Sequence, residues 1–324
     1  MPSITTHHMF AKEVFKNLTK EEQEHIENEK LIYLTFAQSH DFLFYYTFDL
    51  KNAKRIKELG HHAHHHKTQA YLMNIVKNIK EKNLEYNQQA VAYLYGSITH
   101  YCLDSTCHPY IFYKTGIYRK EIPESIKYKG EHDHMEKDLD AIYYEKYTNK
   151  KYNKCNISKE IIGKPVFSKE LIELISASYK NTYNEENIGH FFYKSIKNSK
   201  IITSLAINDS LGIKGTIYKL IDKLTNKKFG YLEAYSTYIL NPNSSYLNLE
   251  HKMWNHPSNK EITYTDSFID LYEKSLKTSL NIIKHINEVL YEGKPLSSLK
   301  KYIPDLDYAT GVPTEESRRM DYFE

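Results

Sequence analysis

Near the end of its first third the chain reads Ile98-Thr99-His100-Tyr101-Cys102-Leu103-Asp104-Ser105-Thr106-Cys107-His108-Pro109. This stretch lies inside a long run, Gln88 to Phe112, whose apolar residues recur at the intervals of an α-helix. Four-residue steps place His100, Asp104 and His108 on one face of that predicted helix. Two imidazoles and a carboxylate in an otherwise buried helix need a partner for their charge and lone pairs. A metal ion is the natural partner, whereas a core histidine bonded to an aspartate would explain only one such pair.

Histidines and carboxylates gather at four further places in the first half of the chain. They are Thr6-His7-His8, Ser39-His40-Asp41 ahead of the aromatic run Phe42–Tyr46, the cluster Gly60-His61-His62-Ala63-His64-His65-His66, and Gly130–Asp140 with His132 and Glu136. Neighbouring positions on a helix point in different directions, so we expect one histidine of the third cluster to bind metal and the other four to be solvated. The repetition of such clusters favours a metal site over an isolated core histidine.

Some of these residues also have simpler interpretations. Asp41 could cap a helix, although a carboxylate beside an aromatic run also suits an aromatic-walled pocket. His132 and Glu136 lie one helical turn apart, as two ligands on one helix must, but a solvated helix shows the same pattern. Cys102 and Cys107 lie off the His/Asp face, so we expect small core residues there rather than zinc ligands.

Together the clusters supply eight candidate metal ligands. They are His7, Asp41, His64, His100, Asp104, His108, His132 and Glu136. This set exceeds what one tetrahedral zinc ion takes, and Asp104, between two histidines on one face, is placed to bridge two ions. The residues therefore predict a multinuclear zinc site with bridged metals on the order of 3.5–4 Å apart. Such sites suit hydrolysis of phosphate esters, because one ion activates a water molecule while the others neutralise phosphate oxygens.

Helical periodicity extends to the rest of the chain, at residues 168–183, 188–205, 216–224 and 267–290, while strand-like alternation is scarce. The expected fold is all-α, a multi-helix domain with a helical C-terminal extension. Residues 1–150 are expected to form a metal-binding helical core, and residues 151–324 a helical part packed on it within one domain. Pro109 should kink or stop the central helix. The polar segment 150–164, followed by Pro165, is the best candidate for a linker or surface crossing.

Composition and charge narrow the possible functions. Hydrophobic residues make up 40% of the 324 and charged residues 26%, which is enough to build a core. Lys+Arg 44 against Asp+Glu 41 leaves a net charge of +3, so nucleic acid is not favoured as a partner. No signal peptide is visible, and no stretch reaches the roughly 18 apolar residues of a membrane span. We therefore expect a soluble, cytoplasmic protein; the sequence does not indicate an oligomeric state.

The order of the ligand clusters resembles that of the bacterial zinc-dependent phospholipase C family. The matching motifs are Thr6-His7, Asp41 before aromatic residues, Gly60 with His64, His100-x-x-x-Asp104-x-x-x-His108, and His132-x-x-x-Glu136. That family is similar to the zinc domain of glycosylphosphatidylinositol phospholipase D and, more remotely, to fungal single-strand nucleases. The ligand motifs span residues 5–140. The closing Tyr308-Ala309-Thr310-Gly311 and Met320-Asp321-Tyr322-Phe323 look like the end of uncharacterised bacterial members.

The resemblance implies an all-helical zinc hydrolase with about three zinc ions per chain. One zinc would take Asp41, His64, His100 and Asp104; a second would take His7, Asp104 and, in the secreted enzymes, the amino-terminal residue; a third would take His108, His132 and Glu136. Asp41 would also be the catalytic residue that orients or deprotonates the attacking water. The secreted enzymes have a processed amino-terminal tryptophan, whereas removal of Met1 here would expose Pro2.

The expected function is that of a zinc-dependent phosphodiester hydrolase. Phospholipase C-like cleavage of a phospholipid would give diacylglycerol and a phosphorylated head group through a metal-activated water. The residues expected to line the metal cluster are Phe42, Phe44, Tyr45, Tyr46 and Tyr101. The alternatives are a nuclease or other soluble phosphodiesterase on the same metals, a zinc-binding protein without turnover, and an unrelated dinuclear phosphohydrolase, whose His-Asp signature His40-Asp41 fits locally.

Overall fold

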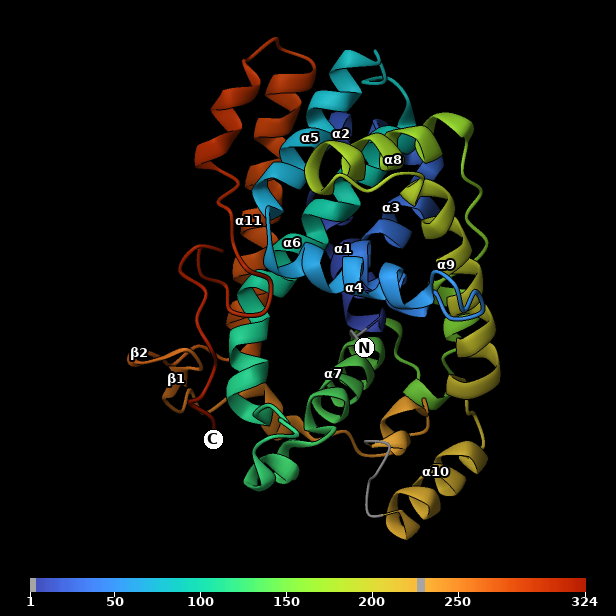
Figure 1. The fold of residues 1–324 in the computed structure, drawn as a ribbon, viewed down its shortest axis with the longest axis vertical. Coiled ribbons are helices and arrows are strands. Elements are labelled where there is room, and N and C mark those ends of the chain that lie inside the picture. Colours follow the sequence, from blue (N-terminus) through green and yellow to red (C-terminus); the bar gives the residue numbers. More distant parts are fainter. Residues whose placement is uncertain (1–3, 226–230) are drawn as a thin grey trace.

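The structure is a computed structural model that describes residues 4–225 and 231–324 of the chain. Its α-helices are α1 (Ile4–Asn17), α2 (Lys20–Glu24), α3 (Lys30–Phe36), α4 (Ala53–His65), α5 (Thr68–Glu81), α6 (Gln88–Thr115), α7 (Glu131–Thr148), α8 (Lys169–Tyr183), α9 (Ile188–Ile202), α10 (Ile213–Leu224) and α11 (Phe268–Leu290). Shorter 3-10 or π-helical turns are η1 (Glu27–Glu29), η2 (Ser39–Tyr45), η3 (Pro123–Tyr128), η4 (Tyr152–Lys154), η5 (Ile157–Ile161), η6 (Thr203–Ile207), η7 (Leu232–Tyr235), η8 (Ser244–Leu247) and η9 (Leu296–Lys301). The predicted all-α fold is confirmed, because the described residues add only one two-stranded sheet to these helices (Figure 1).

Helix α6 is the centre of the fold. It is 28 residues long, starts behind the N-cap Asn87, and is buried along most of its length. Helices α1, α3, α5, α7 and α11 all pack against it, and Figure 1 shows α11 running alongside. A buried helix can keep polar side chains only if they find partners, so the His/Asp face of α6 must be satisfied by other parts of the protein.

Pro109 does not stop α6, so that part of the sequence prediction is wrong. The helix continues to Thr115 and is capped by Gly116, which has a φ of +61° and donates its N–H to the Phe112 carbonyl at 2.9 Å. A proline inside a helix removes one hydrogen bond and costs about 3 kcal/mol. Packing of α6 against α7 and α11 offsets this cost.

Gly96 lets α3 approach α6 closely. A Cβ atom at this position would stand 2.5 Å from the Tyr33 carbonyl oxygen and 2.7 Å from Phe36 Cβ. Any larger residue would therefore push the two helices apart. Because α3 leads into η2, this close approach brings the Asp41 segment toward the turn of α6 that carries His100.

The second half of the chain shares an apolar core with the first. Helix α8 packs on α5, α9 on η2, and α11 on α6 and α1, and buried residues from both halves belong to one cluster. The segment predicted to be a linker or surface crossing is partly buried instead, because Ile157, Ile161 and Ile162 lie in that cluster. The hydrophobic effect thus draws in a segment whose average composition is polar.

The sequence does not predict the small hairpin. Strand β1 (Trp254–His256) pairs antiparallel with β2 (Asn259–Tyr264), and Trp254 stacks on Tyr264 with 4.4 Å between the ring centroids. His256 Nε2 donates to the Thr310 carbonyl at 2.8 Å, which ties the hairpin to the C-terminal segment. None of the described helices is both long enough and apolar enough to cross a membrane.

Candidate metal centre

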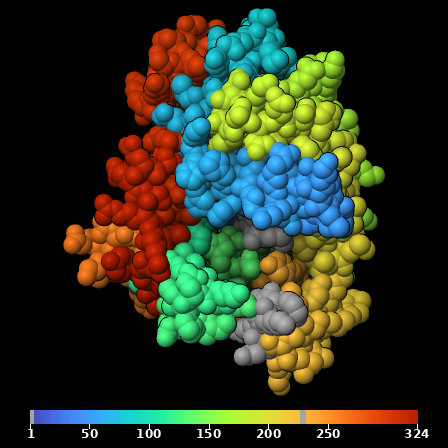
Figure 2. Space-filling model, in the orientation of Figure 1, coloured from blue at the N-terminus to red at the C-terminus, as the bar shows by residue number. Residues whose placement is uncertain are grey.

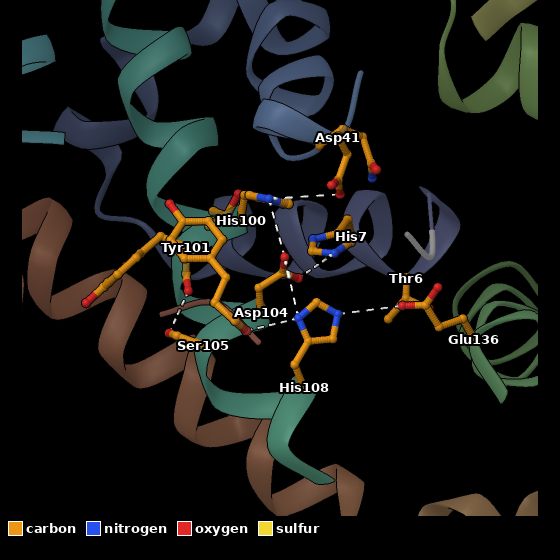
Figure 3. Close-up of polar contacts among 12 residues, drawn as sticks. Thr6, His7, Asp41, His100, Tyr101, Asp104, Ser105, His108 and Glu136 are labelled. Carbon is orange, nitrogen blue, oxygen red and sulfur yellow. Dashed lines mark hydrogen bonds and ion pairs between the residues drawn. The ribbon is translucent and has the colours of Figure 1, made fainter. Parts of the chain in front are cut away.

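The His/Asp face of α6 forms the middle of the centre. Figure 3 shows His100, Asp104 and His108 projecting from this helix toward His7 and Asp41. His100 Nε2 lies 3.4 Å from Asp104 Oδ2, and His108 Nδ1 lies 3.7 Å from the same oxygen. The other oxygen, Asp104 Oδ1, lies 3.0 Å from His7 Nε2. The carboxylate therefore contacts histidines on both sides, as the bridging role predicted for it requires.

Buried Asp140 on α7 fixes the position of His7. Its Oδ1 accepts the Thr6 N–H and the Thr6 hydroxyl, both at 2.7 Å, and its Oδ2 accepts the Thr5 N–H at 3.2 Å. A carboxylate at the start of a helix satisfies backbone donors that have no partner within the helix and suits the helix dipole. Asp140 therefore anchors the first turn of α1, which carries His7, against the helix that carries Glu136.

Asp41 and His64 come from two neighbouring segments, η2 and α4, which pack on each other. His64 Nδ1 donates to the Gly60 carbonyl at 2.6 Å, so its proton sits on that nitrogen and the lone pair on Nε2 faces the centre. His64 Nε2 lies 2.9 Å from Asp41 Oδ1 and 3.4 Å from His100 Nε2. The spacing of Gly60 and His64 along α4 thus places the acceptor for this orienting bond one turn before the ligand.

The eight predicted ligands form two adjoining groups. Ligand atoms of His7, Asp41, His100 and Asp104 all lie within 4.8 Å of one another, and His64 adjoins them; His108, His132 and Glu136 form the second set. In the second group, Glu136 Oε1 lies 3.1 Å from His132 Nε2 and 3.7 Å from His108 Nε2. The contact between Asp104 and His108 connects the two groups. Residues as far apart in the chain as His7 and Glu136, 129 positions, therefore lie in one region of the structure.

The C-terminal segment orients two candidate ligands, His64 and His108, which the sequence did not indicate. The Tyr308 carbonyl accepts from His108 Nδ1 at 3.0 Å, and the Tyr308 N–H donates to the His64 carbonyl at 2.9 Å. The Tyr308 ring packs against the rings of both His64 and His100, with centroids 5.3 and 5.5 Å away. Because the orienting atom is a backbone carbonyl, no residue type marks it in a sequence.

Asp307 holds this segment in place. Its Oδ1 accepts the N–H groups of Ala309 and Thr310 at 2.8 and 3.0 Å, and its Oδ2 accepts from His65 Nδ1 at 2.8 Å and Ser317 Oγ at 3.0 Å. Burial raises the pKa of a carboxyl group, but the bonds from His65 and the backbone outweigh it and lower the pKa of Asp307 to about 2. His65 is therefore not the solvated bystander that the sequence predicted.

Replacing Asp307 by alanine is expected to lower the free energy of unfolding by about 2–4 kcal/mol, because four donors lose their acceptor at a buried position. The measurement is urea unfolding of the zinc-loaded protein. The matched control is Asp321→Ala in the same segment, whose half-exposed carboxylate pairs with Arg119 and Arg319 and should contribute less than about 1 kcal/mol. Equal losses in the two variants would show that Asp307 has no special role.

A cavity of about 370 Å³ opens onto both ligand groups. Its lining contains five candidate ligands, two further histidines of α4 and a larger group of mainly apolar residues. The candidate ligands are Asp41, His64, His108, His132 and Glu136, the further histidines are His61 and His65, and the mainly apolar residues are Phe44, Phe112, Ile117, Tyr308, Ala309 and Met320. Figure 2 shows the corresponding hollow between α4, in blue, and the segment that follows α6, in green. A smaller cavity of about 20 Å³ lies deeper, lined in part by His7, Asp104, His108 and Glu136, and is large enough for a water molecule or an ion.

The expected aromatic lining is mostly wrong. Phe42, Tyr45, Tyr46 and Tyr101 are buried in the core and do not line the cavity; of the predicted set, Phe44 alone lines it. The reason is the geometry of η2, which is a 3-10 helix. Residues i and i+3 lie on the same side of such a helix, so Phe44 follows Asp41 into the cavity while its neighbours turn toward the core.

The electrostatics of the centre favour bound cations. Asp41, Asp104 and Glu136 are each only 3% exposed, and Asp41 Oδ2, Asp104 Oδ2 and Glu136 Oε2 have no hydrogen-bond partner among the described residues. Burial would raise the pKa of Asp104, but the surrounding histidines hold it well below its usual range. Oxygens buried in this way require positive charge nearby.

The histidines respond to the same charges. Burial lowers the pKa of His100 to about 4, so its imidazole is neutral at neutral pH and keeps a lone pair for a metal. For His108, burial is outweighed by Asp104 and Glu136, which raise its pKa to about 9. His7 and His64 also have raised pKa values, because nearby Asp104 and Asp41 outweigh their burial. Imidazole nitrogens and carboxylate oxygens are the donors that zinc prefers, so the residues present fit zinc.

Two further sequence expectations concern neighbouring residues. His40 is not part of either ligand group: its Nδ1 lies 2.5 Å from the Tyr179 hydroxyl, and burial holds its pKa well below the usual range. His40 is thus a core residue, which removes the local support for a dinuclear site built on His40-Asp41. The sequence left open whether the amine of Pro2, exposed by removal of Met1, binds the second metal; Met1 and Pro2 lie outside the described residues.

Comparison with known proteins gives one match. A family model described as zinc dependent phospholipase C matches residues 6–195, which is more than half of the chain. Searches of curated proteins and of solved structures gave no match. The matched range contains all eight candidate ligands and ends before α10 and the C-terminal segment that carries Asp307 and Tyr308.

Proposed function

The chain belongs to the zinc-dependent phospholipase C family, and from that premise we propose that it hydrolyses a phospholipid to diacylglycerol and a phosphorylated head group. The observation that carries the proposal is the convergence of histidines and of buried carboxylate oxygens that have no hydrogen-bond partner among the described residues, beside a cavity with a largely apolar lining. A phosphodiester with an apolar side would have its negative charge neutralised at the metal centre and would contact the apolar residues of the lining.

We assign the eight residues to about three zinc ions in the arrangement that the family resemblance implies. One ion would be held by Asp41, His64, His100 and Asp104, a second by His7 and Asp104, and a third by His108, His132 and Glu136. Zinc bound there would lower the pKa of a water molecule and neutralise phosphate oxygens.

The protein's own groups position the reactants. Asp41 reaches the cavity from η2, where its carboxylate would orient the attacking water and take its proton. The bonds from His64 to Gly60 and from His108 to Tyr308 hold the two imidazoles in the tautomer that presents Nε2 to the cavity. The described residues include no serine or cysteine nucleophile paired with a base among the cavity residues, which favours direct attack by water.

The substrate is tested by offering two phosphodiester classes to one zinc-loaded preparation. Short-chain phosphatidylcholine or phosphatidylethanolamine should be hydrolysed to diacylglycerol, and a zinc chelator should stop the reaction. Single-stranded DNA and RNA should be poorer substrates, because a net charge of +3 supplies little attraction for a phosphate backbone. If DNA or RNA is cleaved rapidly and phospholipids are not hydrolysed, the protein is a nuclease and the proposed substrate is wrong. If neither class is hydrolysed, the result supports a zinc-binding protein without turnover.

A further inference from the structure

Helix α10 carries a row of exposed apolar side chains that no described residue covers. Ile213, Ile217, Leu220 and Leu224 are 60, 51, 56 and 76% exposed. Their spacing places all four on one face of the helix, here called the α10 stripe. Leu211, just before the helix, is also 75% exposed and continues the apolar surface. Contiguous apolar surface of this kind marks an interaction site in a folded protein.

The opposite face of α10 is firmly attached to the rest of the protein. Asp222 accepts the N–H groups of Leu232 and Glu233 at 3.1 and 3.0 Å. The Gly215 N–H donates to Asp209 Oδ2 at 2.7 Å, and the Tyr218 hydroxyl donates to the Ala206 carbonyl at 2.8 Å. The helix cannot turn over to bury the stripe without breaking these bonds, so the stripe faces outward in the folded protein.

These attachments also connect α10 to the metal centre. Turn η7, against which α10 packs, is bonded to α7: Lys137 Nζ donates to the Glu233 carbonyl at 3.0 Å, and the Tyr235 hydroxyl to Asp133 Oδ2 at 3.3 Å. Helix α7 carries His132 and Glu136. In Figure 2, α10, in gold, lies at the lower right of the hollow that leads to the metal centre. Helix α10 is therefore held at a fixed place beside this hollow.

Lysines flank the stripe on both sides. At 100° per residue, Lys214 lies on one side of the apolar face, where its ammonium donates to the Asn208 carbonyl at 2.6 Å. Lys219 and Lys223 lie on the other side and are exposed, so they are the lysines that can reach a docked surface. The acidic residue of this helix, Asp222, is buried and already bonded. Pairing two copies of the chain through this face would bring lysine rows together without acidic partners. Positive charge around an apolar face instead complements a surface of anionic head groups over acyl chains.

We propose that the α10 stripe docks the protein on the surface of a phospholipid bilayer that contains anionic lipid. The apolar side chains enter the boundary between head groups and acyl chains, and the lysines contact the head groups. This proposal rests on the proposed function, because docking beside the cavity entrance is useful to a protein whose metal centre acts on lipid. The stripe lies outside residues 6–195, the range that matches the family model, so the match to the family does not account for it.

The test is sedimentation with vesicles of phosphatidylcholine and phosphatidylglycerol in equal parts. An Asp41→Asn background keeps the lipid composition constant during the measurement. The double variant Ile217→Asp/Leu220→Asp should lower the partition coefficient by about tenfold or more. The matched control, Val166→Asp/Leu249→Asp, changes two isolated side chains that are 73 and 58% exposed and should stay within about twofold of the parent. Circular dichroism of both variants checks that they fold.

Three results would overturn the proposal. The parent protein does not bind vesicles; the stripe and control variants lose binding equally; or the parent is a dimer in sedimentation velocity and the stripe variant is a monomer.

Measurements of turnover separate this proposal from the proposed function. With Asp41 intact, the stripe variant should hydrolyse monomeric short-chain phosphatidylcholine normally and vesicle lipid poorly. If the parent hydrolyses no phospholipid, the proposed function is wrong. Vesicle sedimentation then still shows whether the α10 stripe binds the bilayer.

Discussion

Replacing Asp104 by alanine is expected to remove more than one zinc ion from each chain and to abolish turnover. The two carboxylate oxygens of Asp104 contact different histidines, His7 through Oδ1 and both His100 and His108 through Oδ2. A ligand shared by two ions is needed by both, and without its negative charge the buried site loses much of the attraction that holds cations there. Elemental analysis of protein purified without chelator or histidine tag measures the loss.

Two controls make the zinc count specific. His132→Ala removes a ligand of the second group only and should cost one ion. Asp138→Ala removes another buried carboxylate of α7, whose ion-pair partner is His134, and should leave the zinc content unchanged. A parent protein that holds one zinc or none, or equal losses in Asp104→Ala and His132→Ala, would contradict the assignment of Asp104 as a bridge.

Asp41→Asn is expected to keep the fold and most of the zinc while lowering kcat by about 10²–10⁴-fold. The amide has nearly the same shape but cannot take a proton from water. Asp41 Oδ1 contacts His64, whereas Oδ2 is buried without a hydrogen-bond partner among the described residues and belongs to a side chain that lines the cavity. One oxygen is thus available for the reacting water while the other faces a ligand histidine.

The measurement combines turnover of short-chain phosphatidylcholine, zinc content and thermal unfolding on the same sample. Asp49→Asn is the matched control, since that carboxylate follows η2 but bonds to Tyr46 and Asn52 away from the cavity. It should leave kcat unchanged. Unchanged turnover in Asp41→Asn would move the base to another residue, and loss of zinc together with turnover would make Asp41 a structural ligand only.

The candidate ligand clusters could be found in the sequence because the spacing that marks them is local. His100, Asp104 and His108 lie at helical steps, and His132 and Glu136 repeat that spacing, so each helix carries its ligands on one face whatever it packs against. The family motifs supplied the order of the clusters. The helical fold could also be predicted from the sequence, because apolar periodicity marks long helices such as α6 and α11. The predicted ends of these helices differ from the observed ends, but the helices themselves are found.

Details that depend on neighbouring segments could not be predicted. Pro109 is tolerated because surrounding helices support α6, and the lining of the cavity differs because η2 winds as a 3-10 helix that turns Phe44, and not its neighbours, toward the metal centre. Both outcomes reflect packing energies that exceed the local preferences of the residues involved.

The sequence by itself determined the helical class of this protein and the identity of the residues able to bind metal, because periodicity and side-chain chemistry are properties of single segments. Only the tertiary structure decided how these residues are oriented and what surrounds them. The Tyr308 carbonyl reaches His108, and Asp307 reaches His65, across about two hundred residues of chain or more. The α10 stripe is exposed only because its opposite face is bonded to η7 and η6. Hydrogen bonds to backbone atoms and burial by distant segments carry no signature in residue type or spacing, so they arise from the fold alone.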